Sequence, residues 1–316
     1  MTTSAVKVEN SERGRASLKL LFRLLPPIVI IGLLWNLADG PAALALLADA
    51  DWLYLVLAFV AVNLQTVASA WRWHRVAARL GQYISPGHAV AEYYLSQLVN
   101  QSLPGGVLGD AARAVRARHQ AGLGIAAKAV IIERLAGQIA MFGVLALALA
   151  WAFLTPGGLA LSIGINQVLA GGLVLLVIAV LALLALQPAR RYWRHDLGNS
   201  IVKALIAKGA WIEQLPLAGV IVTLNLASFT LCALATGTTL SPEGIVVLVP
   251  LILCAMLVPT TVAGWGFREG AAAALFPLAG ATAAAGFAAS LAFGLVILAA
   301  SLPGLVFLLR HRPNPV

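Results

Sequence analysis

Long apolar runs separated by short polar segments make up most of this 316-residue chain. Six of the runs approach the length of about 20 residues that a helix needs to cross the hydrocarbon core of a membrane. We place these spans near 20–37, 52–70, 128–151, 167–186, 216–236 and 283–309. The pattern therefore predicts an all-α integral membrane protein with about six full transmembrane helices.

Two further apolar segments, about 85–108 and 245–282, do not fit as single spans. The first leaves and returns to a side rich in Lys and Arg, whereas the second leaves and returns to a side that carries only acidic residues. Each is a candidate re-entrant helical hairpin, and the two would enter from opposite faces of the membrane. Alternatively, each is a pair of tilted, broken spans.

The two segments are interrupted by breaks that share four residue types at the same offsets. Pro104, Val107, Gly109 and Arg113 recur as Pro259, Val262, Gly264 and Arg268. A membrane helix gains nothing from such a break, because lipid cannot satisfy the freed backbone groups. Paired broken segments in two halves of a membrane protein point to a transport site. The shared spacing also suggests an inverted repeat.

The composition supports this interpretation, since 61% of the residues are hydrophobic and 10% are charged. A soluble domain carries about 25% charged residues. No stretch is long and polar enough to form a separate soluble domain. We expect a basic tail at 1–19, a single transmembrane domain at 20–309 that contains an interfacial linker at 187–214, and a short tail at 310–316.

The net charge of +9 does not indicate a nucleic-acid partner, because the basic residues are dispersed at predicted helix ends. The segments 38–51, 153–166 and 237–244 contain no Lys or Arg, so they are the predicted outer loops. By the positive-inside rule, both termini are expected to be cytoplasmic. The basic linker 187–214 either lies on anionic lipid or only fixes the orientation of the chain.

No cofactor or metal is expected from the residue pattern. Cys232 and Cys254 both lie in apolar runs and are interpreted as small hydrophobic residues. The chain has no His-Glu-x-x-His motif, no Gly-x-Ser-x-Gly motif and no P-loop. The stretch 270–289 is rich in Ala and Gly, which favours close helix packing.

The first break combines glycines with a charged pair. Gly105, Gly106 and Gly109 permit backbone conformations with positive φ, and Asp110 is a good N-cap residue type for a following helix. Free amides at a helix N-terminus bind anions, and Arg113 suits bidentate binding of phosphate. The alternative is a helix cap with an intrahelical ion pair between Asp110 and Arg113.

Glu133 and Arg134 lie about one turn into a predicted span, where ionisable residues usually face the protein interior and pair. Adjacent helical residues point about 100° apart, so we expect the two to serve different partners. Glu133 is predicted to face Arg113 or Arg268, and Arg134 the headgroup region. Alternatively, Arg134 simply extends to the membrane surface.

The second break places Arg268 and Glu269 after Gly264 and Gly266, in a stretch that otherwise lacks charge. We expect an ion pair inside a cavity. Eight polar residues are candidates either for lining the same cavity or for hydrogen bonding between helices: Asn63, Gln65, Glu92, Gln97, Asn100, Gln101, Gln138 and Asn225.

Three motifs in this order carry a resemblance to a known family: Asn100-x-x-Leu103-Pro104-Gly105-Gly106-x-x-Gly109-Asp110-x-x-Arg113, then Glu133-Arg134-Leu135, then Gly264-x-Gly266-x-Arg268-Glu269-Gly270. From about 15 to 310 the chain resembles the transmembrane region of lysylphosphatidylglycerol synthetases. That family includes stand-alone flippase-like proteins of the bacterial inner membrane, some associated with hopanoid or polyprenyl-glycan pathways. The resemblance implies that the charged residues of these motifs are the family's characteristic ones.

The resemblance implies a flippase-like transporter of an anionic or amphipathic lipid, that is, of a phospholipid, a hopanoid or a polyprenyl-linked lipid. Arg113, Arg134 and Arg268 would hold the headgroup, and Glu133 and Glu269 would neutralise the arginines of the empty site. The family's aminoacyl-transferring soluble domain is not among these residues, so we expect no aminoacyl transfer. Two alternatives remain: a membrane-embedded lipid-modifying transferase, or a scaffold subunit that binds lipid-synthesis enzymes.

Overall fold

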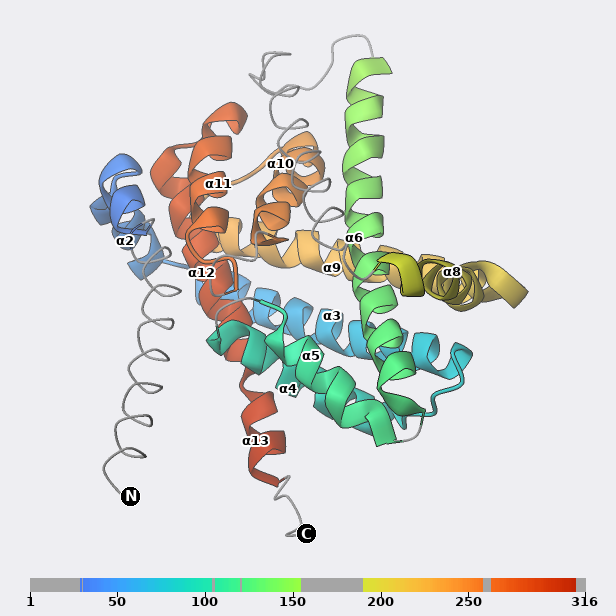
Figure 1. Ribbon diagram of the computed structural model, residues 1–316. Helices are drawn as coiled ribbons and strands as arrows, with labels where there is room; N and C mark the ends of the chain where they lie inside the picture. The colour runs from blue at the N-terminus through green and yellow to red at the C-terminus, as the bar shows by residue number, and fades with distance from the viewer. Residues whose placement is uncertain are drawn as a thin grey trace, which may run out of the picture.

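The computed structural model of the chain describes residue 29 and residues 31–103, 106–119, 121–154, 190–257 and 263–310 (Figure 1). All regular structure in these ranges is helical, and none of these residues lies in a strand. The predicted all-α class is therefore confirmed.

Four helices in the described ranges are long and apolar enough to cross a membrane. They are α3 (Trp52–Arg79), α6 (Gly122–Leu154), α9 (Ala210–Ala235), and α12 (Ala283–Ser301) continued by α13 (Pro303–Arg310). Each overlaps one of the predicted spans. Large apolar side chains on their outer faces, such as Trp52 and Leu147, are exposed, as expected for helices in lipid. The protein is a multi-pass membrane protein.

The count of six spans is not reached in the described ranges. The predicted span 167–186 lies outside them. Of the predicted span 20–37, the helix Ile31–Leu37 is described, and it meets α2 (Gly40–Ala48) at an angle of 95°. Asp39 caps α2, since its side chain accepts a hydrogen bond from the amide of Ala42. The described helices thus give four candidate spans, or five if this bent pair crosses as one.

The two halves of the described chain share an order of elements. In each, a long helix is followed by a shorter helix, a break, a nine-residue helix and a second long helix. The first set is α3, α4 (Pro86–Ser102), α5 (Leu108–Arg116) and α6; the second is α9, α10 (Pro242–Cys254), α11 (Phe267–Leu275) and α12. Both shorter helices begin at a proline preceded by a capping serine, Ser85 or Ser241.

The shared Pro-Val-Gly-Arg spacing does not mark structurally equivalent positions. Arg113 is the sixth residue of α5, whereas Arg268 is the second residue of α11. Matching the two helices by their first residues instead pairs Asp110 with Glu269, since each is the third residue of its helix. The resemblance between the halves therefore lies in the order of elements and in this acidic position.

In each hairpin of the structure, two helices pack against each other, α4 with α5 and α10 with α11. Glycine is needed where the two segments of each hairpin approach each other closely. A Cβ atom on Gly109 would lie 2.0 Å from the backbone oxygen of Ser96 in α4. A Cβ atom on Gly264, which has a φ of +79°, would lie 2.8 Å from the Cα atom of Met256. The first hairpin extends beyond its predicted end at 108, because α5 is part of it.

The predicted linker 187–214 is described from residue 190. It consists of α8 (Arg190–Ile201), a π-helical turn η3 (Val202–Ile206) and a short 3₁₀ turn η4 (Ala207–Gly209). The linker therefore ends at Gly209 rather than at 214, because α9 begins directly after it.

The long helices α3 and α9 pack side by side and run across the molecule, between α6 on one side and α12 on the other (Figure 1). Three phenylalanines fill the core beside α9, with ring centroids of Phe229 lying 6.3 Å from Phe276 and 5.2 Å from Phe293. A Cβ atom on Gly286 of α12 would lie 2.3 Å from the backbone oxygen of Ala272. Small residues in the stretch 270–289 thus serve close packing, as predicted.

Candidate functional site

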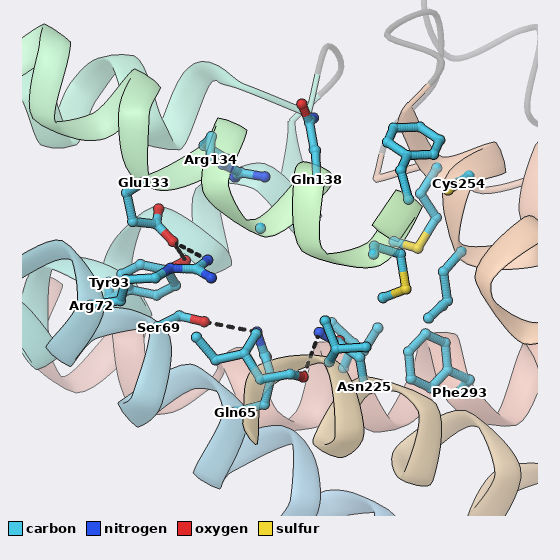
Figure 2. Close-up of a pocket in the computed structure, with 18 residues that line it drawn as sticks. Gln65, Ser69, Arg72, Tyr93, Glu133, Arg134, Gln138, Asn225, Cys254 and Phe293 are labelled. Atoms are coloured by element: carbon cyan, nitrogen blue, oxygen red, sulfur yellow. Dashed lines mark hydrogen bonds and ion pairs between the residues drawn. The ribbon is translucent and has the colours of Figure 1, made fainter. Parts of the chain in front are cut away.

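A cavity of about 250 Å³ lies between α3, α4, α6, α9, α10 and α12 (Figure 2). We call it the main cavity. Arg72, Tyr93 and Glu133 line one side of it, and Cys254 and Phe293 line the opposite side. The remaining lining residues include polar ones, Gln65, Ser69, Arg134, Gln138 and Asn225, and apolar ones, Gly137, Met141, Phe142, Ile221, Val222, Leu253, Met256 and Ile297. The cavity is therefore amphipathic.

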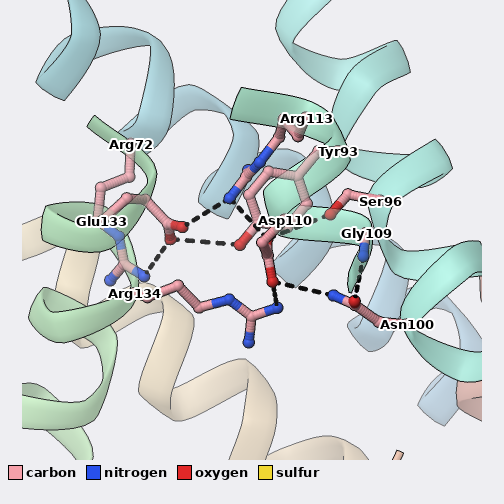
Figure 3. Close-up of polar contacts among 9 residues, drawn as sticks. All are labelled: Arg72, Tyr93, Ser96, Asn100, Gly109, Asp110, Arg113, Glu133 and Arg134. Carbon is pink, nitrogen blue, oxygen red and sulfur yellow. Dashed lines mark hydrogen bonds and ion pairs between the residues drawn. The ribbon is translucent and has the colours of Figure 1, made fainter. Parts of the chain in front are cut away.

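Five charged side chains from three elements form a continuous network beside this cavity (Figure 3). Glu133 binds Arg72 at 2.7 Å between Oε1 and Nη2, and it binds Arg113 at 3.4 Å between Oε2 and Nη2. Arg113 also binds Asp110 at 2.9 Å, and Arg134 binds the other oxygen of Asp110. We call these five residues the first charged network.

Neutral groups of α4 complete the coordination of both carboxylates. Ser96 and Asn100 donate hydrogen bonds to Asp110 at 3.1 and 3.0 Å, and Tyr93 donates one to Glu133 at 3.2 Å. Asp110 lies outside the four candidate spans. Burial disfavours its ionised form, but the charges of Arg134 and Arg113 outweigh this effect, so the pKa of Asp110 lies below its ordinary value.

Arg113 is enclosed by aromatic rings and does not reach the main cavity. Its guanidinium lies 4.5 Å from the ring centroids of both Trp73 and Tyr93, and the side chain is fully buried. Cations over aromatic faces are stabilised by the ring quadrupole. Arg113 is thus a fixed positive charge that holds Asp110 and Glu133 from behind the wall of the cavity.

Arg72 differs from Arg113 because it lines the main cavity directly. Its Nε and Nη1 atoms are buried and have no hydrogen-bond partner among the described residues. Unpartnered buried donors are costly, so they mark a place where a ligand or water can bind. The network contains three arginines and two carboxylates, which leaves one positive charge unbalanced. This arrangement is suited to binding an anionic group.

A second charged network consists of Arg268, Glu269 and Ser290. Arg268 binds Glu269, and its Nε donates to the Ser290 hydroxyl at 3.0 Å, which in turn donates to Glu269 at 3.2 Å. The other oxygen of Glu269 accepts a hydrogen bond of 2.6 Å from the amide of Gly266. Arg268 and Glu269 are fully buried.

The side chain of Phe293 connects the main cavity to the second network. Phe293 lines the cavity, and its ring centroid lies 5.4 Å from the guanidinium carbon of Arg268. Trp265 lies against the same guanidinium at 5.1 Å. Arg268 itself does not line the cavity, so it is separated from a ligand there by an aromatic ring.

The structure brings the predicted site residues together in two groups. Gly109, Asp110, Arg113, Glu133 and Arg134 belong to the first network or contact it. Gly264, Gly266, Arg268 and Glu269 lie at or beside the second. Gly106 has a φ of +59° in the break before α5, and Gly105 lies outside the described residues.

Of the two expectations about Glu133 and Arg134, the first is confirmed in one of its alternatives and the second is not. Glu133 contacts Arg113, as one alternative predicted, and not Arg268. Arg134 turns to Asp110 instead of the headgroup region. The two adjacent side chains point in different directions, but both belong to one network. Arg113 binds both Glu133 and Asp110, and Asp110 binds Arg134.

Arg72 is the charged residue of the first network that the sequence analysis did not single out. It was grouped with the other basic residues at predicted helix ends. The available signal was its spacing, since Gln65, Ser69 and Arg72 follow one another at intervals of four and three residues and therefore lie on one face of α3.

Three of the eight additional polar candidates, Gln65, Gln138 and Asn225, line the main cavity. Others hydrogen-bond between helices. Asn63 accepts from Tyr94, and Gln97 accepts from Thr66. Among the described residues, no group of three or more His, Cys, Asp and Glu side chains is arranged to hold a metal ion.

The fold and these buried networks define a helical, multi-pass membrane protein with an amphipathic, positively charged cavity. Residues 23–304 match the family described as Lysylphosphatidylglycerol synthase TM region, and the chain belongs to this family. Membership indicates a membrane protein involved in lipid handling. Neither a curated protein nor a solved structure matches the chain.

Proposed function

We propose that the protein is a flippase-like transporter that moves an anionic lipid across the bacterial inner membrane, with the lipid headgroup held in the main cavity. The observation that carries this proposal is Arg72, which lines the main cavity and whose Nε and Nη1 atoms have no hydrogen-bond partner among the described residues. A phosphate oxygen of a headgroup would supply the missing acceptors.

Arg72 and Arg134 are the cations that contact the headgroup, because both line the cavity. Arg113 acts from behind the wall by positioning Asp110 and Glu133. In the empty state these carboxylates neutralise two of the three arginines, which lowers the cost of burying the charges in the membrane. The apolar side of the cavity, around Met256, Phe293 and Ile297, accommodates the first part of the lipid tails.

The volume of the cavity favours a small headgroup over a glycan. Pockets for drug-sized ligands measure about 300–1,000 Å³, whereas this cavity measures about 250 Å³. A phosphate with a short polar substituent suits this space, and Gln65, Gln138 and Asn225 offer amide groups to such a substituent. We therefore favour phospholipids among the amphipathic lipids considered from the sequence.

The transport cycle we propose uses the two helical hairpins as alternating gates, related as an inverted repeat with both termini in the cytoplasm. The common order of elements in the two halves supports this relation. Transporters built from inverted repeats place their substrate sites near the bilayer midplane, between discontinuous helices. The first hairpin carries Asp110, and the second carries Glu269.

The test is a lipid-scrambling assay with the purified protein in proteoliposomes that contain fluorescent anionic, zwitterionic or polyprenyl-phosphate lipids. We expect transport of the anionic phospholipid and its loss in Arg72→Gln. The matched control is Arg75→Gln on the same helix, because Arg75 binds Glu213 at the surface and does not line the cavity. Equal activity in wild type and Arg72→Gln refutes the site. Chemical conversion of a lipid, detected by mass spectrometry, would favour a transferase.

A further inference from the structure

A second cavity, of about 480 Å³, lies at the base of the first hairpin. We call it the basal cavity. It is bounded by the first turns of α4, with Ser85, His88 and Glu92, and by the end of α5 and the following 3₁₀ turn η1 (Ala117–His119), with Arg116 and His119. It shares no described lining residue with the main cavity.

Glu92 organises the cationic groups of this cavity. Its carboxylate is 4% exposed, and its Oε2 atom accepts a hydrogen bond of 2.7 Å from Nε of Arg116. Its Oε1 atom lies 4.0 Å from Nε2 of His88. The hydrogen bond from Arg116 to this buried carboxylate fixes the orientation of the guanidinium. Glu92 thus orients Arg116 and lies next to His88.

The guanidinium of Arg116 retains binding capacity. Only its Nε atom donates to Glu92, and its Nη2 atom is buried and lacks a hydrogen-bond partner among the described residues. His119 supplies a second imidazole at the rim, and the capping Ser85 places the amino end of the 17-residue helix α4 at the same cavity. A guanidinium and two imidazoles together match the oxygens of a phosphate group.

We propose that the basal cavity is a second binding site, which takes a phosphate group through Arg116, His88 and His119. The site does not depend on the function proposed for the main cavity. The phosphate belongs either to a soluble ion or to the headgroup of a lipid in the adjacent leaflet.

The test uses the full chain purified in detergent, with radiolabelled inorganic phosphate in equilibrium dialysis. Wild type is expected to bind phosphate saturably, and Arg116→Gln to bind it at least about tenfold more weakly, since a charge-assisted hydrogen bond is lost. The matched control is Arg118→Gln, two residues away, exposed and absent from the cavity lining, which is expected to bind within about twofold of wild type.

Native mass spectrometry in mixed detergent distinguishes the two sources of the phosphate group. Retention of phosphatidic acid over phosphatidylcholine, lost in Arg116→Gln, identifies a lipid headgroup, whereas binding of inorganic phosphate without this preference identifies a soluble ion. If Arg116→Gln does not fold, His119→Gln replaces it and should also weaken phosphate binding, because His119 is an exposed residue that lines the cavity and is one of the three proposed ligands. Absence of saturable binding of both probes, or equal losses in Arg116→Gln and Arg118→Gln, overturns the proposal.

Discussion

The pair of Arg72 and Glu133 offers a quantitative test of the first charged network. Their side chains are 4% and 1% exposed, and their atoms Nη2 and Oε1 lie 2.7 Å apart. Removing one partner of a buried ion pair costs about 3–5 kcal/mol, because the other charge stays buried without compensation. We therefore expect Glu133→Gln and Arg72→Gln each to lower the free energy of unfolding strongly.

The structure also predicts an order between the two variants. Glu133 serves both Arg72 and Arg113, whereas removal of Arg72 leaves Glu133 with Arg113 at 3.4 Å. Glu133→Gln should therefore cost more than Arg72→Gln. The double variant removes both charges of the pair, so its cost should fall below the sum of the single costs by about 2 kcal/mol.

The assay is unfolding in mixed detergent micelles, followed by tryptophan fluorescence, for the two single variants and the double variant. Arg75 and Glu213 provide a matched control cycle, because they form an ion pair between α3 and α9 with side chains 38% and 40% exposed. This control pair should couple by less than about 1 kcal/mol. Additive costs for Arg72→Gln and Glu133→Gln would refute the view that the buried network is held by mutual neutralisation.

Two further predictions address the second network and the main cavity. Gly294→Ala would place a Cβ atom 2.4 Å from Nη2 of Arg268, so it should destabilise the protein by about 1–3 kcal/mol in the same unfolding assay. Gly219→Ala, which meets no atom within 4 Å, should be neutral or stabilising, and equal effects of the two would contradict the packing argument. A small thiol reagent should label Cys254, which lines the main cavity, much faster than the core residue Cys232, and an anionic lipid that fills the cavity should slow this labelling. Equal labelling of the two cysteines would indicate that the cavity is closed to solutes.

The sequence predicted much of the fold because its main signals are local. Apolar length located α3, α6, α9 and α12, and glycines marked the breaks before α5 and α11. The presence of charge within apolar stretches singled out Asp110, Glu133 and Glu269, which the structure places in the buried networks. These predictions follow from a single physical fact, the high free-energy cost of placing polar groups in lipid.

The pairing of the charges could not be predicted in the same way, because it depends on how the helices rotate about their axes. Arg72 and Arg75 are equally basic and belong to the same helix, yet one is buried beside Glu133 and the other pairs with Glu213 at the surface. The predicted span ended at 70, whereas α3 continues to Arg79. Counting positive charges therefore placed Arg72 at the membrane surface. The structure instead places it in the interior of the protein.

In the transport cycle that we propose, the unbalanced charge of the first network has a consequence for the energetics. Three arginines face two carboxylates, so the empty site carries one positive charge, and a lipid phosphate with one negative charge brings the sum to zero. An elementary charge that crosses a membrane voltage of 100 mV changes in energy by about 2.3 kcal/mol. The energy of the loaded carrier would then not depend on the membrane voltage, whereas the energy of the empty carrier would. One charge would then cross the membrane for each lipid moved, so the membrane voltage would add to the driving force and, together with the lipid gradient, set the direction of net lipid flow.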